Sequence, residues 1–568
     1  MKTIFTLFLI VVTAHVISAQ SWGWAHSSFA FSCDNYGKGI VSDKNGNTYI
    51  TGRFSSPSMD FLGLPNLLNA NSTGCYEDYF IAKFDSLGNT VWAQRAGGSG
   101  DDGGNSIAMD TSGNIYVTGY FAGGSVTFDT VTVSTVSPGA NFFIVKYTPS
   151  GNALWGRVAT GAGDQIGNSI ATDRKNNVYV TGAFQNKIIF GTDTVTTNTG
   201  ESAFIVKYDA TGNKLWAQAA NVSGFGSGTD HIRGEGICTD VSGHTYISGM
   251  FSSATMIMNS DTLMKISAGP TSDIFLLKLD SLGNALWAKN YGANNDLYTN
   301  SSVTTDKFGN VFLTGGYGNA MAMGSTMLPM RSPGNKIFTA KLNSSGAVLW
   351  AQSAGLGLNP SYGTDVAPNQ GRSIVSDSSG NVWITGNLTD SATFGAISLY
   401  GFTGVFLVKY DPLGNAVFGT SVNGTDYNAG NGVSLDKNQT PYITGFFQSL
   451  NLTFVPYTIS NYGFRNVFIA KLGPGLTTDM VVLSKESSFI IYPNPNNGAM
   501  SFEYELKNND KGEVEIYDIT GRKIVSYELE TGSKIITISE TTLNSGMYFY
   551  IYKINGSVEK SEKIIIAK

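Results

Sequence analysis

The chain has 568 residues, of which 68 are glycine, 12% are aromatic and only 14% are charged, and its net charge is −6. This composition is typical of many short strands joined by tight turns, and it excludes a largely helical or disordered protein. Because the small net charge is negative and no basic stripe occurs, we expect neither nucleic acid nor an anionic membrane as a partner.

Residues 1–19 have the features of a secretory signal peptide. Lys2 precedes an apolar run from Ile4 to Val12, and a small-residue cleavage site ends at Ala19. The run is too short for a membrane-spanning helix, and no later stretch approaches that length. We therefore expect an exported chain without a membrane span.

A ten-residue pattern close to D-x-x-G-N-x-Y-x-T-G recurs through most of the chain. Its copies begin at Asp43, Asp110, Asp173, Asp240, Asp306, Asp377 and Asp436. A second pattern, such as FIVKYDATGNKLWAQ at 204–218, alternates with the first. Together they predict four strands per unit, which we name a, b, c and d in chain order. Four strands repeated radially predict a β-propeller with seven blades.

The two ends of the repeated region complement each other. The seventh copy of the second pattern, FIAKLGPG at 468–475, stops before its tryptophan strand, whereas SWGWAH at 21–26 is a tryptophan strand with nothing before it. This arrangement predicts a closed ring in which the first strand completes the last blade. The units resemble the bacterial SBBP-type β-propeller repeats over residues 21 to about 473, and the resemblance implies an architecture of exported and surface proteins without a common activity.

The turn chemistry predicts two unlike ends of the ring. The a–b and c–d turns, which an aspartate caps and a glycine or asparagine closes, should form one end, the short-turn rim. The long d–a and b–c connections should form the opposite end, the long-loop rim, where recognition usually occurs. A lysine recurs in every c strand, and we expect it to pair with a turn aspartate. These lysines are Lys83, Lys146, Lys207, Lys278, Lys341, Lys409 and Lys471.

One aspartate precedes strand a in every d–a loop. The set is Asp34, Asp101, Asp164, Asp230, Asp296, Asp365 and Asp426. Two interpretations are open: a carboxylate ring near the channel mouth that binds a cation such as calcium, or a series of loop ties to backbone amides, which glycine-rich loops need. No other cofactor is expected.

The cysteines and histidines point to no catalytic or zinc site. Cys33 and Cys75 fall in two connections on the same rim of the first blade, so a disulfide between them is a candidate. Cys238 takes the place of a small alanine in strand a and is expected in the core. His231 follows an aspartate of the loop set, but no histidine pair has metal spacing, and no nucleophile or phosphate motif occurs.

The last part of the chain differs in composition. Charged residues become about twice as frequent after residue 486, so we expect a propeller over 20–473, a linker over 474–486 and a second domain over 487–568. Short strands and turns there predict a small immunoglobulin-like β-sandwich.

This second domain resembles a type A C-terminal sorting domain of the type IX secretion system. YPNPNNG, IYDITGRKI, LNSGMYFYIY and KIIIAK carry the resemblance, with the motif residues Pro493, Asn494, Pro495, Gly498, Asp518, Gly521, Arg522, Gly546, Tyr548 and Lys568. The resemblance implies recognition by the type IX machinery and delivery to the cell surface or the medium, without catalysis.

The sequence thus predicts an all-β, exported binding or adhesion module. We expect a glycan or protein ligand on the long-loop rim. Two alternatives stay open: an extracellular polysaccharide-active enzyme, such as a lyase or glycosidase, and a purely structural surface or matrix component. An enzyme is the less favoured, because no symmetry-breaking catalytic set converges on the axis.

Overall fold

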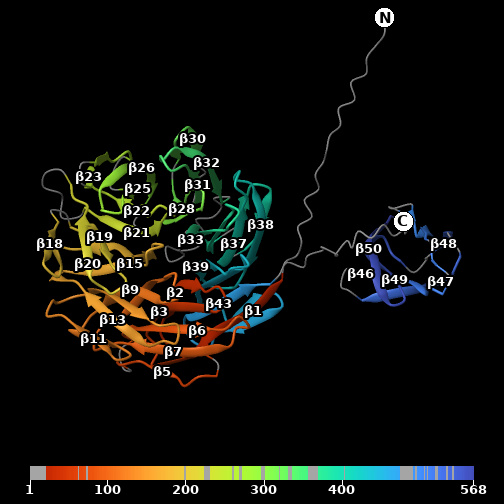
Figure 1. The fold of residues 1–568 in the computed structure, drawn as a ribbon, viewed down its shortest axis with the longest axis horizontal. Coiled ribbons are helices and arrows are strands. Elements are labelled where there is room, and N and C mark those ends of the chain that lie inside the picture. Colours follow the sequence, from red (N-terminus) through yellow and green to blue (C-terminus); the bar gives the residue numbers. More distant parts are fainter. Residues whose placement is uncertain are drawn as a thin grey trace, which may run out of the picture. The chain divides into compact units, whose positions relative to one another are not determined.

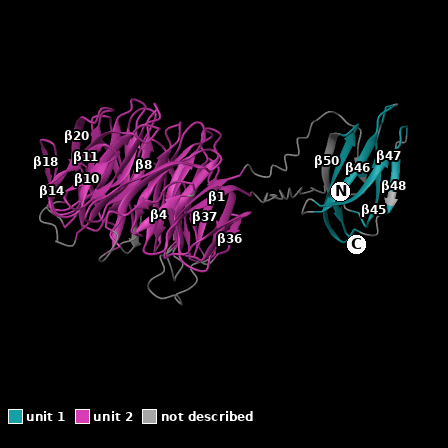
Figure 2. Cartoon of the chain, turned by 90° about the horizontal axis from the view of Figure 1, so that it is seen from below, with its two compact units in different colours: residues 1–19, 475–568 teal, residues 20–474 magenta. Residues whose placement is uncertain are grey.

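The computed structural model describes the chain in two compact units. The first lies within residues 20–474 and the second within residues 475–568 (Figure 2). The description omits residues 1–20, 62, 72–74, 198–199, 223–229, 259–260, 268–270, 296–300, 319, 330–335, 356–368, 390, 402, 474–489, 493–495, 505, 508, 519–521, 533–534, 540–542 and 568. The expected signal peptide and linker lie outside the described residues. Within the described ranges, no helix has the length and apolar character needed to cross a membrane.

The described strands of the first unit form seven antiparallel sheets around an axis, each in the order a-b-c-d (Figure 1). The innermost strands, a, are β2 (Asn35–Ser42), β8 (Gly103–Met109), β15 (Gln165–Thr172), β21 (Ile232–Thr239), β27 (Ser302–Thr305), β33 (Gln370–Ser376) and β39 (Asn428–Leu435). The b strands are β3 (Thr48–Phe54), β9 (Ile115–Phe121), β16 (Val178–Phe184), β22 (Thr245–Phe251), β28 (Val311–Tyr317), β34 (Val382–Leu388) and β40 (Pro441–Phe447).

The outer half of each sheet consists of the two strands of the second sequence pattern. The c strands are β6 (Asp78–Phe84), β12 (Asn141–Tyr147), β19 (Ser202–Tyr208), β25 (Ser272–Leu279), β31 (Lys336–Leu342), β37 (Gly404–Tyr410) and β43 (Asn466–Leu472). The d strands are β7 (Thr90–Ala96), β13 (Ala153–Val158), β20 (Lys214–Ala219), β26 (Ala285–Asn295), β32 (Val348–Ala354), β38 (Ala416–Val422) and β1 (Trp22–Phe29). We number these sheets as blades 1 to 7 in the order of their a strands.

The ring closes as the sequence predicts. β1 pairs antiparallel with β43, with Trp24 opposite Lys471 and Ala25 opposite Ala470. In Figure 1 this red N-terminal strand lies beside the blue strand β43. Trp22 and Trp24 are both buried. The Trp22 ring packs edge to face against Phe454, with 4.9 Å between the ring centres. The first strand of the chain is therefore strand d of the last blade.

The b–c connections differ from the expectation that they lie wholly on the long-loop rim. Each contains a hairpin whose apolar side chains pack along strand d. In blade 2, the Val133 side chain lies directly over Gly156 of that strand. The Asp129 carboxylate at the tip of that hairpin accepts a bond from the Ala153 N–H, at the short-turn end of strand d. The hairpins are β4 (Ser58–Phe61) with β5 (Leu67–Leu68), β10 (Ser125–Phe128) with β11 (Val131–Ser134), β17 (Lys187–Phe190) with β18 (Asp193–Thr196), β23 (Thr255–Met258) with β24 (Asp261–Met264), β29 (Met321–Met323) with β30 (Thr326–Leu328), β35 (Ala392–Phe394) with β36 (Ile397–Leu399), and β41 (Asn451–Phe454) with β42 (Tyr457–Ser460). A short strand, β14 (Thr160–Ala162), joins one of them at β17.

The core of the ring lies between neighbouring blades. One cluster joins Tyr49 and Ile81 of blade 1 to Val117 and Phe143 of blade 2, and all four side chains are at most 1% exposed. Because each sheet packs between two others, the central strands b and c are buried on both faces, which explains their continuous apolar runs.

The second unit is a small two-sheet β-structure. One sheet contains β44 (Ile490–Tyr492), β45 (Ala499–Glu503) and β48 (Ile535–Ser539). The other contains β46 (Gly512–Asp518), β47 (Lys523–Leu529), β49 (Gly546–Ile554) and β50 (Ser557–Ile566). Phe502, Val514, Tyr550 and Ile564 belong to the apolar cluster that these strands form. This arrangement fits the β-sandwich that the sequence predicts.

Candidate functional site: the axial cavity

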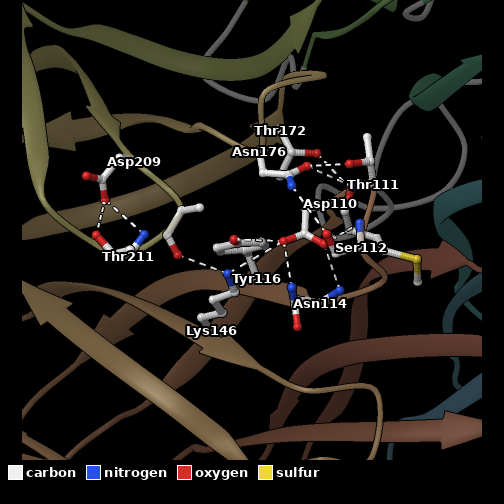
Figure 3. A network of polar contacts seen from close by, with 12 residues as sticks. Asp110, Thr111, Ser112, Asn114, Tyr116, Lys146, Thr172, Asn176, Asp209 and Thr211 are labelled. Carbon is white, nitrogen blue, oxygen red and sulfur yellow. Dashed lines mark hydrogen bonds and ion pairs between the residues drawn. The ribbon is translucent and has the colours of Figure 1, made fainter.

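The short-turn rim is built from one repeated network. In blade 2, the Asp110 Oδ1 accepts bonds from the N–H groups of Ser112 (2.9 Å) and Asn114 (2.8 Å), and its Oδ2 accepts from the Asn114 amide (2.9 Å) and the Tyr116 hydroxyl (3.0 Å) (Figure 3). The two backbone bonds recur at every a–b turn: Asp43, Asp110, Asp173, Asp240, Asp306, Asp377 and Asp436. The repeated aspartate is therefore a turn cap, as predicted.

Two turns lack the usual glycine and use the replacement side chain to bind the neighbouring blade. Asn176 and Gln439 adopt the positive φ of that position, 63° in both. The Asn176 Oδ1 accepts bonds from the Thr111 N–H and hydroxyl of blade 2 (Figure 3). The Gln439 Oε1 accepts from the Ser378 N–H of blade 6. An inter-blade bond thus offsets the backbone strain at both departures from the pattern.

The c-strand lysines bind mainly a different partner from the one expected. Among the described residues, only Lys146 and Lys409 lie within 4 Å of a turn aspartate, at 3.6 and 3.3 Å. The others, and Lys146 as well, donate to a carbonyl in the c–d turn of the next blade, as Lys207 does to Ser281 at 2.8 Å. The tryptophan of strand d donates to the same carbonyl. The turn aspartates have little free capacity, because donors of their own turn already occupy both oxygens.

The innermost strands share a backbone irregularity that faces the axis. In six of the seven described a strands, a β-bulge follows a glycine, so one residue has no partner on strand b. The glycine is required because a Cβ there would collide with a threonine of the preceding blade, as one at Gly234 would with the Thr181 hydroxyl. We name the bulge residues and Ser301, which holds the equivalent place before β27, the axial ring: Lys38, Asn105, Asn168, Glu235, Ser301, Arg372 and Asn431.

Three members of the axial ring tie one blade to the next. Asn105 donates its side-chain amide to the Gly167 carbonyl at 3.0 Å, Asn168 to the Gly234 carbonyl at 2.9 Å, and Asn431 to the Gly37 carbonyl at 2.8 Å. The acceptor in each case is the glycine before the bulge of the following blade. Asparagine is therefore the structural residue of this position.

The charged members break this pattern. Neither the Lys38 ammonium nor the Glu235 carboxylate makes a hydrogen bond or ion pair with any described residue, although Lys38 lies 5.2 Å from the centre of the Tyr36 ring. Arg372 binds neutral groups: the Asn387 and Asn431 side-chain oxygens and the Tyr427 hydroxyl. Charged groups in a confined site normally have partners, so two unpaired ones are unusual.

Burial shifts the protonation of both unpaired groups. It lowers the pKa of Lys38 to about 7, and the cations Arg53 and Arg372 add to this effect while Glu77 opposes it. Burial also raises the pKa of Glu235 to about 7, against the attraction of Arg233 and with a contribution from Glu201. Strongly perturbed groups of this kind cluster at functional sites.

The axial ring surrounds a cavity of about 430 Å³, which residues of all seven innermost strands line. Next to the polar ring, two residues further along each strand towards the short-turn rim, lies an apolar ring that includes Ile40, Ile107, Ile170, Ile237, Val303 and Ile374. The cavity therefore combines polar walls with one apolar end, the usual composition of a small-molecule site.

The predicted aspartate set has several different environments. The Asp101 carboxylate accepts a bond from the Glu77 N–H, and that of Asp164 accepts one from the Ala140 N–H, both at 2.9 Å. Asp426 caps the Tyr427 N–H, while Asp230 accepts a bond from the Glu201 N–H through its own carbonyl. Asp296 and Asp365 lie outside the described residues. Over the part of the chain that the structure covers, no three acidic, histidine or cysteine side chains gather as a metal site, and cation binding by this set stays a prediction.

Asp34 belongs to the closure of the ring. Its carboxylate lies 3.4 Å from the guanidinium of Arg465 in blade 7. The Arg465 guanidinium also lies 5.7 Å from the centre of the Tyr36 ring and 5.6 Å from that of Phe446. A disulfide joins Cys33, the residue before Asp34 in the same d–a connection, to Cys75 in the b–c connection of blade 1. Electrostatic, aromatic and covalent contacts therefore secure the first blade.

The remaining singled-out residues have structural contacts. His231 lies 3.4 Å from Glu201, which also binds Arg233. Cys238 packs against the cluster between blades 4 and 5, and burial raises the pKa of its thiol. In the second unit, Arg522 lies 3.1 Å from Asp518, the Tyr548 hydroxyl donates to the Asn544 carbonyl, and Gly498 and Gly546 have positive φ. The other motif residues, Pro493, Asn494, Pro495, Gly521 and Lys568, lie outside the described residues.

Sequence reasoning missed the axial ring. The signal was present: in the six bulged strands, one residue lies between two small ones, as in Gly37-Lys38-Gly39 and Gly234-Glu235-Gly236. The residue that follows this glycine is asparagine in three units and a charged residue in the three others. Departures from the repeat were expected at the histidines and in the long loops, whereas the chemically most different residues lie within strand a.

Comparison with known proteins agrees with this architecture. Residues 490–567 match the model of the secretion system C-terminal sorting domain, and residues 91–120 and 154–183 match that of the beta-propeller repeat. An uncharacterized WD repeat-containing protein of Acanthamoeba polyphaga mimivirus is 26% identical over 497 residues, which are 77% of this chain and 32% of the relative. The chain thus spans about a third of the length of that relative.

Similar solved structures include a protein of unknown function from Dyadobacter fermentans and Sqt1 from Chaetomium thermophilum. The first has 10% identity and a TM-score of 0.33, covering 79% of this chain and 98% of the other. The second has 8% identity and a TM-score of 0.33, covering 81% and 100%. The family matches carry the assignment: the chain bears SBBP-type β-propeller repeats within residues 91–183 and a type IX secretion sorting domain at residues 490–567, which indicates export to the cell surface or the extracellular space.

Proposed function

We propose that the protein is an exported binding module, of the adhesion type, whose ligand enters the axial cavity from the long-loop rim. One observation carries this proposal: the axial ring replaces structural asparagine by charge at Lys38, Glu235 and Arg372, and two of these charges have no described protein partner. Unpaired, partly buried charges destabilise a folded chain, so a ligand that pairs with them is the simplest reason to retain them.

The same observation favours binding over a purely structural role. A structural ring gains stability from asparagine at every axial position, as Asn105, Asn168 and Asn431 show by their inter-blade bonds. The Lys38 and Glu235 side chains make no such bond to a described residue, and neither gains another described partner in its place. With a volume of about 430 Å³, the axial cavity can hold a small molecule or the end of a larger ligand.

The test uses the double variant Lys38→Asn/Glu235→Asn, which restores the structural residue while it removes the charges. The full chain is screened on arrays of bacterial glycans and short peptides, and each ligand found is titrated against wild type and variant. We expect at least one ligand whose affinity for the double variant is about tenfold or more lower than its affinity for wild type.

Exposed charges provide the matched control. Lys44→Asn on the short-turn rim and Glu530→Gln in the sorting domain remove the same charges from exposed residues, and these changes should leave binding unchanged. If neither array yields a ligand, or if the axial variant binds as wild type does, the proposed binding function is wrong.

We also propose that residues 487–568 direct the final export step. A chain without them should fold its propeller but remain in the periplasm, since the sorting domain carries the signal that the type IX machinery reads. Fractionation followed by surface proteolysis measures this directly. A truncated chain that still reaches the surface would contradict the sorting role.

A further inference from the structure

The axial cavity presents opposite charges on opposite sides. Lys38 belongs to blade 1 and Glu235 to blade 4. These blades are three steps apart around the ring, which is the largest separation that two of seven blades can have. Both side chains line the same cavity and are half-buried. No ion pair joins them, so each charge is available to a ligand.

The cationic side has two groups that can bind an anion together. Lys38 of blade 1 and Arg372 of blade 6 line the same cavity and belong to blades that only blade 7 separates. The described contacts of Arg372 are neutral oxygens, so its positive charge is not compensated by a carboxylate. An ammonium and a guanidinium that converge on one space favour a carboxylate ligand.

The anionic side has one available carboxylate. Arg233, the nearest cation along β21, already binds Glu201, and Glu235 makes no described hydrogen bond. Between the two charged sides, Asn105 and Asn168 line the cavity and donate their side-chain amides to inter-blade bonds, and their amide oxygens have no described donor. The wall on this side thus offers acceptors but no second anion site.

We infer that the axial cavity binds a short zwitterion, whose carboxylate pairs with Lys38 and Arg372 and whose ammonium pairs with Glu235. This inference rests on the proposed binding function and names its ligand class, which includes ω-amino acids and short free peptides. The apolar ring of isoleucines and Val303 at one end of the cavity accommodates the methylene groups between the two charges.

The test is calorimetric titration of the full chain with a graded series of ligands. The ω-amino acids β-alanine, 4-aminobutanoate, 6-aminohexanoate and 8-aminooctanoate place the two charges at increasing separations. Diglycine falls between the second and third of them, and triglycine matches the longest with peptide groups in place of methylenes. Because the charged groups are fixed by the ring, one length should bind best, and both shorter and longer members should bind several-fold more weakly.

Paired changes in ligand and protein then locate each end. N-acetylation of the best ligand removes its cation, and amidation removes its anion. Glu235→Asn should weaken the zwitterion about tenfold or more but leave the weaker binding of the N-acetyl ligand unchanged. Lys38→Asn should behave in the same way towards the amidated ligand.

Two results would overturn the inference: no measurable binding across the whole series, or equal losses for the zwitterion and its capped forms in each variant. A glycan or peptide found on the arrays, lost in the double variant but insensitive to competition by the series, would refute the zwitterion while it supports the proposed function. Failure of both the arrays and the series would refute both.

Discussion

The a–b turns and the axial ring follow opposite rules. At the short-turn end, seven aspartates make the same two backbone bonds in every blade, and the departures from the pattern at Asn176 and Gln439 are compensated by new contacts. Within strand a, the axial ring consists of asparagine, serine, lysine, arginine and glutamate, and the departures at Lys38 and Glu235 are not compensated by a described partner. Repetition therefore maintains the scaffold, while uncompensated change marks the candidate site.

Ring closure should give the largest effect, because symmetry fails if the seventh blade lacks a strand. Deletion of residues 21–26 removes two buried tryptophans, Trp22 and Trp24, at an expected cost of about 6–10 kcal/mol. That is most of the stability of a typical domain. Scanning calorimetry should show a loss of the cooperative transition or a large fall in melting temperature.

A synthetic peptide with the sequence of residues 21–29 provides the matched rescue. Added to the truncated chain, it should restore the transition, since it can pair with β43 as β1 does. A truncated chain that melts at the wild-type temperature without peptide would show that β1 is dispensable and that the ring closes in another way.

The disulfide on the long-loop rim should have the next largest effect. Cys33 and Cys75 are separated by 42 residues, and cross-linking a loop of this length is worth about 4 kcal/mol in the chain-entropy model. Cys33→Ser/Cys75→Ser should lower the free energy of unfolding by about 2–4 kcal/mol. Reductant should destabilise wild type and leave this variant unaffected; a wild type that is insensitive to reductant would contradict the prediction.

The buried turn caps should matter more than the exposed ones. Asp110→Ala leaves the Tyr116 hydroxyl and Lys146 without an anionic partner in a buried site, and we expect a loss of about 2–3 kcal/mol. Asp85→Ala removes an equivalent set of local bonds at a more exposed c–d turn and should cost about 1 kcal/mol. Urea denaturation of both variants measures the difference, and equal losses would show that the buried tyrosine and lysine contacts add nothing.

The axial charges should give the smallest effect, and one of opposite sign. Lys38→Asn removes an unpaired charge and allows an inter-blade bond to Gly104 like that of Asn105 to Gly167, and Glu235→Asn removes an unpaired charge, so each should raise the free energy of unfolding by about 1 kcal/mol. The reverse change, Asn105→Lys, should lower it. A loss of stability in Lys38→Asn and Glu235→Asn would show that these charges have a structural partner.

The gain should depend on pH. The folded-state pKa of Glu235 is raised from 4.5 to about 7, so its charge destabilises the fold increasingly as pH rises from about 4.5 to about 7. The pKa of Lys38 is lowered from 10.5 to about 7, so its charge destabilises the fold increasingly as pH falls from about 10.5 to about 7. The melting-temperature difference between the double variant and wild type should therefore be largest near pH 7. A difference that does not change with pH would contradict the unpaired-charge interpretation.

The repeated architecture can be predicted from contiguous stretches of the chain. The spacing of the Asp-Gly-Asn turns predicts four-stranded units because turn conformation depends on a few neighbouring residues. The orphan strand at 21–26 predicts closure because an unpaired apolar strand needs an edge to pair with. The sorting-domain motifs are likewise contiguous, and a family model matches the same region.

The set of residues that meet at the axis is evident only in the folded ring. Lys38, Glu235 and Arg372 are separated by more than a hundred residues, and each stands alone in its own strand. Their convergence depends on closure of the ring and on a bulge that turns one residue of each strand towards the cavity. The partners of the c-strand lysines also depend on which turn of the next blade lies closest. The conformation of a local turn depends on adjacent residues. A site shared by seven blades, in contrast, forms only when long-range packing brings those blades together.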